Sequence, residues 1–156
     1  MKIPPFLLLA ALLATATHLP ASEEMEKEFK ERFRAFIEAG DVSRQALETV
    51  WLYEDTPTRE FIRSQGKFES TIARGLETIE IVDIYPQMRE GLDDPVQLEG
   101  ATYVINLEPY GMLEATYRQE IEGGSDGWSY VLGKKDGKLY LVGLTERDPI
   151  EETLPE

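Results

Sequence analysis

Residues 128–144 read Trp128-Ser-Tyr-Val-Leu-Gly-Lys-Lys-Asp-Gly-Lys-Leu-Tyr-Leu-Val-Gly-Leu144, and this stretch decides the fold that we expect. Asp136-Gly137 lies between two β-rich runs. An Asp-Gly pair favours the two-residue turn in which both residues have positive φ. The sequence therefore predicts an antiparallel hairpin of Ser129–Gly133 with Leu139–Leu144. The second arm is apolar on both faces, so we expect it inside the sheet or covered by helices instead of at a free edge.

Three more β-rich runs precede this hairpin. Glu77–Tyr85 is rich in β-branched residues, and Pro109-Tyr110-Gly111 separates Leu98–Leu107 from Met112–Ile121. Gly123–Gly127 forms a longer connection to the hairpin. The run at Met112–Ile121 has an apolar and a polar face, which predicts a half-buried strand. The apolar face consists of Leu113, Ala115, Tyr117 and Ile121, and the polar face consists of Glu114, Thr116, Arg118 and Glu120.

The region before the strands is expected to be helical. Glu23–Ala39 repeats apolar residues at helical spacing, with Ser22 as the N-cap and Gly40 as the end. The polar face of this helix is too acidic for a membrane surface, so we expect its apolar stripe to pack on the sheet. The stripe consists of Met25, Phe29, Phe33, Phe36 and Ile37.

Shorter helices are expected between this long helix and the first strand. One is capped by Asp41, a second runs from Thr56-Pro57 to Gly66, and a third runs into Gly75. Pro86–Pro95 is expected to be a polar loop. The side chains expected to face inward are Val42, Ala46, Leu47, Val50, Trp51, Phe61, Ile62, Phe68, Ile72 and Leu76. Helices followed by a curved antiparallel sheet of about five strands make the predicted fold class α+β, in a single domain.

The N-terminus has the pattern of a secretory signal peptide. An apolar core, Phe6–Ala14, follows Lys2, and small residues permit cleavage after Ala16 or after Ala21. The alternative is an N-terminal membrane helix, for which the apolar core is short. We therefore expect residues 1–21 to be the signal peptide, 22–145 the α+β domain and 146–156 an acidic flexible tail. The expected localisation is secreted or periplasmic, without stable membrane insertion after processing.

The composition excludes several kinds of chemistry. The chain has no Cys, and its one histidine, His18, lies beside the expected cleavage region. Disulfides, thiol nucleophiles, imidazole catalysis and the usual zinc sites are therefore excluded from the folded domain. Asp93-Asp94 and Gly124–Gly127 do not match a calcium-binding loop, and turn chemistry explains both. We assign no catalytic residue, no metal ligand and no cofactor from the sequence.

The chain is strongly acidic, with 30 acidic residues, 16 basic residues and a net charge of −14. Removal of the leader removes one positive charge, Lys2, so the net charge changes from −14 to about −15. This charge disfavours nucleic acid and anionic lipid as partners, because both are polyanions.

The order of these elements resembles that of the nuclear transport factor 2-like superfamily. The resemblance lies in the long helix Glu23–Ala39, the short helices to Gly75, the strand Glu77–Tyr85 and the final meander that ends in Gly-Lys-Leu-Tyr-Leu-Val-Gly143. It implies a cone in which the sheet curls around a helix and leaves a pocket. Some members of the superfamily are isomerases, hydratases or cyclases, and many are non-catalytic binding or dimerisation modules. The cystatin-like fold is a related shape, but this chain has no Gln-x-Val-x-Gly inhibitor loop.

Four aromatic residues of the strands are the candidate ligand-binding residues: Tyr103, Tyr117, Trp128 and Tyr130. Trp128 and Tyr130 share one face of a strand, where they either stack on a ligand or act as cross-strand core partners. The resemblance also implies an acid–base alternative, in which a buried carboxylate faces a Tyr hydroxyl in the cone. The residues considered for that role are Asp83, Glu114, Tyr53 and Tyr85, together with the tyrosines above.

These observations favour a non-catalytic binding or protein-interaction module, because the folded part contains no His, no Cys and no catalytic motif. The expected partner is a protein or a small apolar ligand. The alternative is a small-ligand enzyme of the isomerase or hydratase type that uses Asp/Tyr acid–base chemistry. A homodimer that pairs its sheets is a further alternative.

Overall fold

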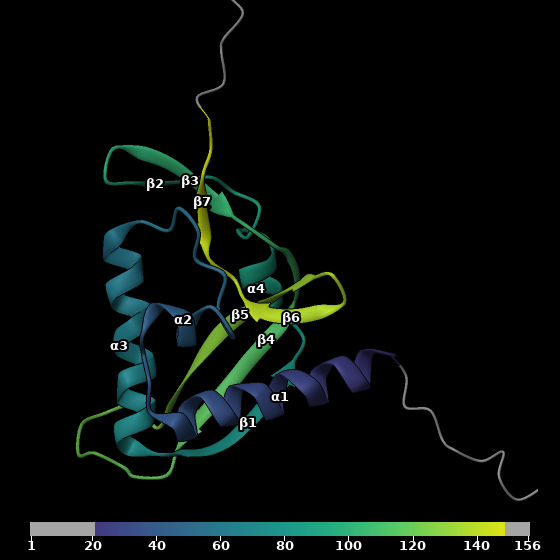
Figure 1. Cartoon of the computed structure of the whole chain (residues 1–156). Helices are drawn as coiled ribbons and strands as arrows, with labels where there is room; N and C mark the ends of the chain where they lie inside the picture. Colours follow the sequence, from purple (N-terminus) through teal and green to yellow (C-terminus); the bar gives the residue numbers. More distant parts are fainter. Residues whose placement is uncertain (1–20, 149–156) are drawn as a thin grey trace, which may run out of the picture.

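The computed structural model describes residues 21–148, so residues 1–20 of the predicted leader and residues 149–156 of the predicted tail lie outside the described residues. Its strands form two antiparallel sheets (Figure 1). The larger sheet has the order β1-β4-β5-β6, and the smaller has the order β2-β3-β7. The strands are β1 (Leu76–Val82), β2 (Val96–Leu98), β3 (Ala101–Ile105), β4 (Glu108–Tyr117), β5 (Gly127–Lys135), β6 (Lys138–Leu141) and β7 (Leu144–Glu146).

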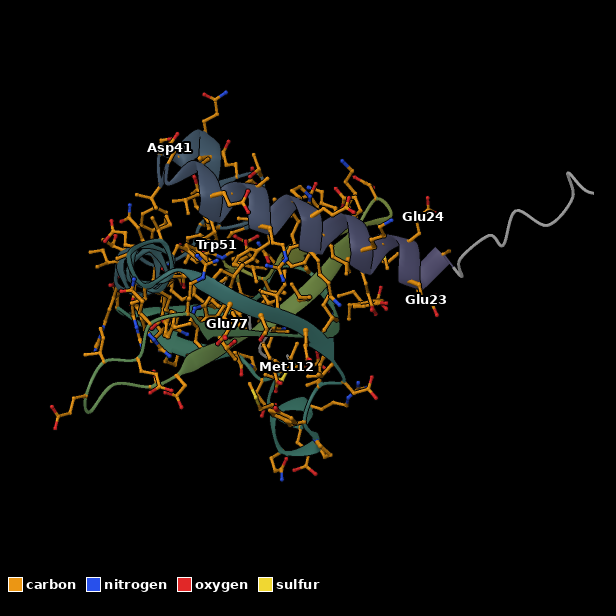
Figure 2. All side chains as sticks on the ribbon, turned by 90° about the horizontal axis from the view of Figure 1, so that it is seen from below. Glu23, Glu24, Asp41, Trp51, Glu77 and Met112 are labelled. Carbon is orange, nitrogen blue, oxygen red and sulfur yellow. The ribbon has the colours of Figure 1, made fainter. Side chains whose placement is uncertain are left out.

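Two long helices cover one face of the larger sheet. They are α1 (Ala21–Ala39) and α3 (Thr58–Arg74), and the short helix α2 (Arg44–Leu47) lies between them in the chain. The side chains of α1 and the interior Trp51 fill the space above the sheet (Figure 2). The main core contains residues from all of these elements, among them Phe29, Phe33, Phe68, Leu113 and Leu132, which are completely buried. The predicted fold class, α+β with N-terminal helices on a curled antiparallel sheet, is confirmed.

The long N-terminal helix is confirmed together with its phenylalanine stripe. Phe29, Phe33, Phe36 and Ile37 are its buried residues. The helix already includes Ser22, which was predicted as the N-cap. Its acidic first turn suits the positive end of the helix dipole.

Helix α3 corrects the prediction of two helices separated at Gly66. It is one continuous helix of 17 residues, and Gly66 lies within it. A glycine inside a helix costs only about 1 kcal/mol relative to Ala. The burial of Phe68 after it and the partial burial of Phe61 before it keep both halves on the core. Ile62 was predicted to face inward but is 61% exposed.

Helix α2 starts two residues later than predicted. The hydroxyl of Ser43 accepts a hydrogen bond from the Ala46 N–H at 3.4 Å and caps the helix. Asp41, the predicted cap, instead accepts a hydrogen bond from the Ser43 N–H at 2.8 Å. The carboxylate therefore orders the turn before the helix and not the helix itself.

The Asp-Gly hairpin between β5 and β6 is confirmed. Asp136 has φ 50° and Gly137 has φ 75°, and Lys135 pairs with Lys138 across the turn. The β2–β3 hairpin has the same kind of two-residue turn at Glu99 and Gly100, with φ of 51° and 84°. This turn was not predicted from the sequence, because Glu is uncommon at positive φ.

Three predictions about the middle strands were wrong. The run Leu98–Leu107 is divided between β2 and β3, which belong to the smaller sheet. Pro109-Tyr110-Gly111 does not separate strands but lies inside β4, where the pairing register shifts between Pro109 and Gly111. An irregularity of this kind accommodates a proline that has no N–H for the ladder. Ile121 is 57% exposed and lies beyond the end of β4.

The last apolar run also differs from the prediction, because it is shared by both sheets. β6 is the edge strand of the larger sheet, and β7 pairs with β3. The chain leaves the first sheet at Gly143, where a Cβ atom would lie 2.0 Å from the Leu52 carbonyl oxygen. The outer side of β6 is not free: the Leu141 N–H donates to the Val50 carbonyl at 2.8 Å, and the Leu52 N–H donates to the Leu141 carbonyl at 3.2 Å.

A second, smaller core lies on the face of the larger sheet opposite to α1. It is formed by Ile84, Met112, Val131 and Val142. The segment after β1, which includes the short helix α4 (Pro86–Arg89), lies on this side (Figure 2). The predicted polar loop Pro86–Pro95 therefore contains a helical turn.

Candidate binding pocket

The four aromatic residues predicted to bind a ligand do not form one group. Trp128 and Tyr130 lie side by side on β5, with ring centroids 6.2 Å apart. Tyr117 lies on β4, and the guanidinium of Arg74 sits 3.8 Å from the centre of its ring. Tyr103 belongs to β3 in the smaller sheet. The structure therefore keeps the pair on β5 as a candidate and separates it from Tyr103.

Trp128 acts mainly as a core residue. Its ring packs edge-on against Phe33 and Phe68, with each centroid 6.0 Å away. Its indole Nε1–H donates to the hydroxyl of Thr71 at 2.7 Å. The cross-strand core alternative therefore describes Trp128 better than an exposed stacking platform does.

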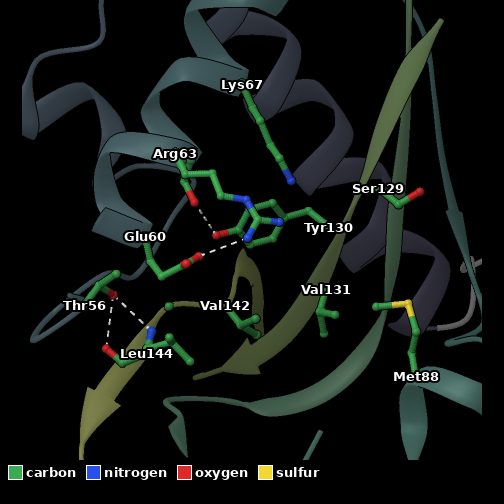
Figure 3. A pocket seen from close by; sticks show the side chains of 12 residues that line it. Thr56, Glu60, Arg63, Lys67, Met88, Ser129, Tyr130, Val131, Val142 and Leu144 are labelled. Carbon is green, nitrogen blue, oxygen red and sulfur yellow. Dashed lines mark hydrogen bonds and ion pairs between the residues drawn. The ribbon is translucent and has the colours of Figure 1, made fainter. Parts of the chain in front are cut away.

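Tyr130 lies at the border between this core and a pocket. Its hydroxyl is 2.9 Å from that of Ser64 on α3. Burial raises the pKa of the Tyr130 hydroxyl, so it remains a neutral hydrogen-bonding group. The pocket has a volume of about 220 Å³. Its lining comes from α3, α4, β5, the chain after β6 and the start of β7. It includes Glu60, Arg63, Ser64, Lys67, Met88, Ser129, Tyr130, Val131, Val142 and Leu144 (Figure 3).

Lys67 is the cation of this pocket that sequence reasoning missed. Its ammonium lies 5.3 Å from the ring centre of Tyr130 and 6.0 Å from that of Trp128. Within residues 21–148, no carboxylate forms an ion pair with Lys67, and Glu60 is paired with Arg63 at 3.5 Å. Burial lowers the pKa of the Lys67 ammonium, the charge of Arg63 lowers it further, and the charge of Glu60 opposes both in part. The side chain was overlooked because α3 was expected to end at Gly66, one residue earlier.

The residues considered for acid–base chemistry lie outside this pocket. Glu114 accepts a hydrogen bond from the hydroxyl of Tyr85, which is 43% exposed. Glu114 lies on the face of β4 opposite to Tyr117, as predicted, and Asp83 is exposed. The Tyr53 hydroxyl donates to the Arg44 carbonyl at 3.1 Å. The buried polar residues of the described part are Ser64, Thr71 and Arg74, none of which is a carboxylate.

Residues 21–148 contain no cluster of three or more His, Cys, Asp and Glu side chains suited to a metal ion. Over the same residues, no helix combines the length and the hydrophobicity needed to span a membrane. Comparisons of the chain with protein-family models, with curated proteins and with solved structures find no match.

Proposed function

We propose that the protein is a non-catalytic binding module, and that the pocket around Lys67 holds an acidic group of its ligand. The observation that carries this proposal is a half-buried ammonium without a carboxylate partner among the described residues. Removing a charge from water is costly unless the charge is compensated. Two aromatic rings compensate Lys67 in part, and an anionic ligand completes the compensation.

The rest of the lining supports a ligand that is acidic at one end and apolar at the other. Ser64 and Tyr130 place two hydroxyl groups in the same pocket, and either one can donate to a carboxylate. Val131 and Val142 are buried apolar residues on the other side of the pocket, and Met88 is 41% exposed beside them. This arrangement of a few polar groups in an apolar wall is typical of ligand pockets.

The acid–base alternative is not proposed, because the Tyr85–Glu114 pair lies outside the pocket. The proposal includes export, which the leader pattern of residues 1–21 supports. It also includes membership of the nuclear transport factor 2-like superfamily. Helices that pack on a curled sheet agree with the shape that this resemblance implies. The proposed export is tested separately, by peptide mass mapping of the mature N-terminus.

Binding of small acids to the ¹⁵N-labelled protein tests the proposed function. Hexanoate should give saturable amide shifts at Ser64, Lys67 and Tyr130, whereas the neutral hexanamide should bind much more weakly. Lys67→Met keeps the apolar stem and removes the charge, so it should weaken hexanoate binding by about tenfold or more, as expected for loss of a charge-assisted hydrogen bond. Lys27→Met is the matched control, because the Lys27 side chain on α1 is 66% exposed and does not line this pocket.

Equal affinity for hexanoate and hexanamide would refute the role of the cation. Unchanged hexanoate binding by the Lys67→Met variant would refute it as well. The absence of any saturable shift at the pocket would refute the binding proposal itself.

A further inference from the structure

The edge of β5 is open beside the pocket. β6 pairs with β5 only from Leu132 to Lys135, and the chain turns away toward β7 after Val142. Gly127–Val131 therefore has β4 on one side and no strand of the described residues on the other. The pocket lies at this gap (Figure 3), because Ser129, Val131 and Leu144 all line it.

The backbone polar groups of this edge point into the gap. The Val142 N–H donates to the Val131 carbonyl at 3.0 Å, so Val131 directs its polar groups away from β4. In an antiparallel ladder, this direction alternates from one residue to the next. Ser129 therefore presents its N–H and C=O on the open side, and no backbone hydrogen bond within residues 21–148 reaches them.

The segment Val142–Leu144, which lies beside this gap, has no such unpaired backbone groups. The Val142 carbonyl accepts from the indole of Trp51 at 3.1 Å. Asn106 binds both the N–H and the C=O of Gly143, at 2.9 and 3.2 Å. The hydroxyl of Thr56 binds both the N–H and the C=O of Leu144, at 3.0 and 3.1 Å. The backbone N–H and C=O groups of Val142–Leu144 therefore have hydrogen-bond partners, whereas those of Ser129 on the neighbouring β5 edge have none in the described part of the chain.

The two sides of the open edge differ in chemistry. Tyr130 points toward Lys67 and Arg63 on α3, whereas Ser129 points to the other side, where Met88 lies (Figure 3). A strand that pairs with this edge directs successive side chains to these two sides in turn. Its acidic side chains would meet the cations of α3, and its apolar side chains would meet Met88 and Val131.

We propose that an extended peptide with alternating acidic and apolar residues binds as an added strand along β5, with a carboxylate at Lys67. This inference deepens the proposed function and depends on it, since it names the ligand class of the same pocket. Main-chain hydrogen bonds to the edge supply affinity, and the alternating side chains supply specificity, as in other cases of strand addition.

The opposite edge of the larger sheet does not offer the same site. It belongs to β1, on which Glu77 and Glu80 are exposed. These charges repel an acidic peptide and discourage pairing at that edge. The protein as a whole is acidic, with a net charge of −14, and Arg63 is already paired with Glu60, so Lys67 gives the β5 edge its selectivity for a carboxylate.

Binding of acetyl-Val-Glu-Leu-Glu-Val-amide to the complete mature protein tests this inference. The peptide should bind more tightly than hexanoate, and Lys67→Met should weaken it by about tenfold or more. The same peptide with Lys in place of Glu should not bind measurably. Methylation of single backbone nitrogens should lower affinity by about tenfold at alternate residues only, because every second N–H of an added strand faces its neighbour.

Ser129→Pro gives a matched test on the protein side. It removes the open N–H and blocks the edge, while the pairing of β5 with β4 does not use this N–H. Edge strands tolerate such a proline, so the fold should be retained. The variant should lose peptide binding, whereas Ser129→Ala, which retains the open N–H, should bind the peptide.

The outcomes separate this inference from the proposed function. If hexanoate binds but the peptide does not, strand addition is wrong and the acid pocket stands. The same conclusion follows if every N-methylated peptide binds equally, or if the folded Ser129→Pro variant binds peptide normally. If neither hexanoate nor the peptide binds the wild-type protein, both proposals fail.

Discussion

Replacement of Trp51 by Phe should reveal how much the contacts of Trp51 beside the β6 edge stabilise the protein. Trp51 is completely buried, and its ring packs against Tyr53, Phe61 and Phe68 at centroid distances of 4.7, 5.4 and 5.8 Å. Its indole N–H is the hydrogen-bond donor to the Val142 carbonyl, at the point where the chain leaves the sheet. Trp51→Phe keeps an aromatic ring but removes this donor.

Two costs add up in this variant. A buried carbonyl left without its partner costs about 1–3 kcal/mol. The smaller ring leaves unfilled volume in a close-packed core, which costs about 1–2 kcal/mol more. The free energy of unfolding should therefore fall by about 2–5 kcal/mol, a large share of the stability of a domain of this size.

Urea unfolding followed by far-ultraviolet circular dichroism measures this loss without relying on tryptophan fluorescence. Tyr53→Phe is the control, because it removes a hydroxyl that donates to the carbonyl of the exposed residue Arg44 at 3.1 Å. Water can replace that bond, so the control should cost less than about 1 kcal/mol. A Trp51→Phe variant that loses no more stability than Tyr53→Phe would refute this description of the edge.

Three more outcomes follow from the packing and the titrating groups. Gly143→Ala should lower the free energy of unfolding measured in urea by about 3 kcal/mol or more. The Cβ of the new alanine would lie 2.0 Å from the Leu52 carbonyl oxygen, so the backbone must shift. A loss below about 1 kcal/mol would contradict the close contact of Gly143 with Leu52. Burial and a 2.8 Å hydrogen bond to Glu26 raise the pKa of Tyr110 from 10.0 to about 12. This bond therefore stabilises the protein below pH 10 and ceases to do so as the pH rises through 12, so the stability difference between wild type and Tyr110→Phe should shrink over that interval. Burial lowers the pKa of Lys67 below 10.5, so the charged form opposes folding at neutral pH. Lys67→Met should therefore raise the thermal unfolding temperature at neutral pH, and this gain should shrink as the pH rises toward 10.5. The same difference in unfolding temperature between variant and wild type at both pH values would contradict the burial of the charge.

Local patterns predicted the elements whose signals are contained in their own residues. The phenylalanine stripe of α1 and the positive φ of Asp136-Gly137 depend on helical spacing and on turn chemistry alone. The alternation along β4 likewise predicted that Leu113 and Tyr117 are buried on one face.

Features that depend on distant contacts could not be predicted in this way. A glycine is a local signal for a helix end, yet Gly66 lies inside α3 because packing on both sides of it outweighs its low helix propensity. The apolar run from β6 to β7 resembles one strand, and only the close contact of Gly143 with Leu52 shows why the chain changes sheets.

The same distinction applies to the candidate site. Trp128 and Tyr130 were predicted to share a face because both lie on one strand, and they do. Tyr103 was placed with them because its run was expected to join the same sheet, but β3 pairs with β2 and β7. Lys67 faces these aromatic rings from a different element, so its role depends on how α3 packs over β5, which sequence spacing does not reveal.

Hydrogen exchange of single backbone amides in the free protein tests the open β5 edge most directly. We expect slow exchange at Tyr130, whose N–H faces β4, and at Val142, whose N–H donates to the Val131 carbonyl. Ser129, which lies between protected neighbours but faces the gap, should exchange close to the rate of an unstructured peptide. Protection of Ser129 equal to that of Tyr130 would show that the edge is already occupied and would rule out strand addition at β5.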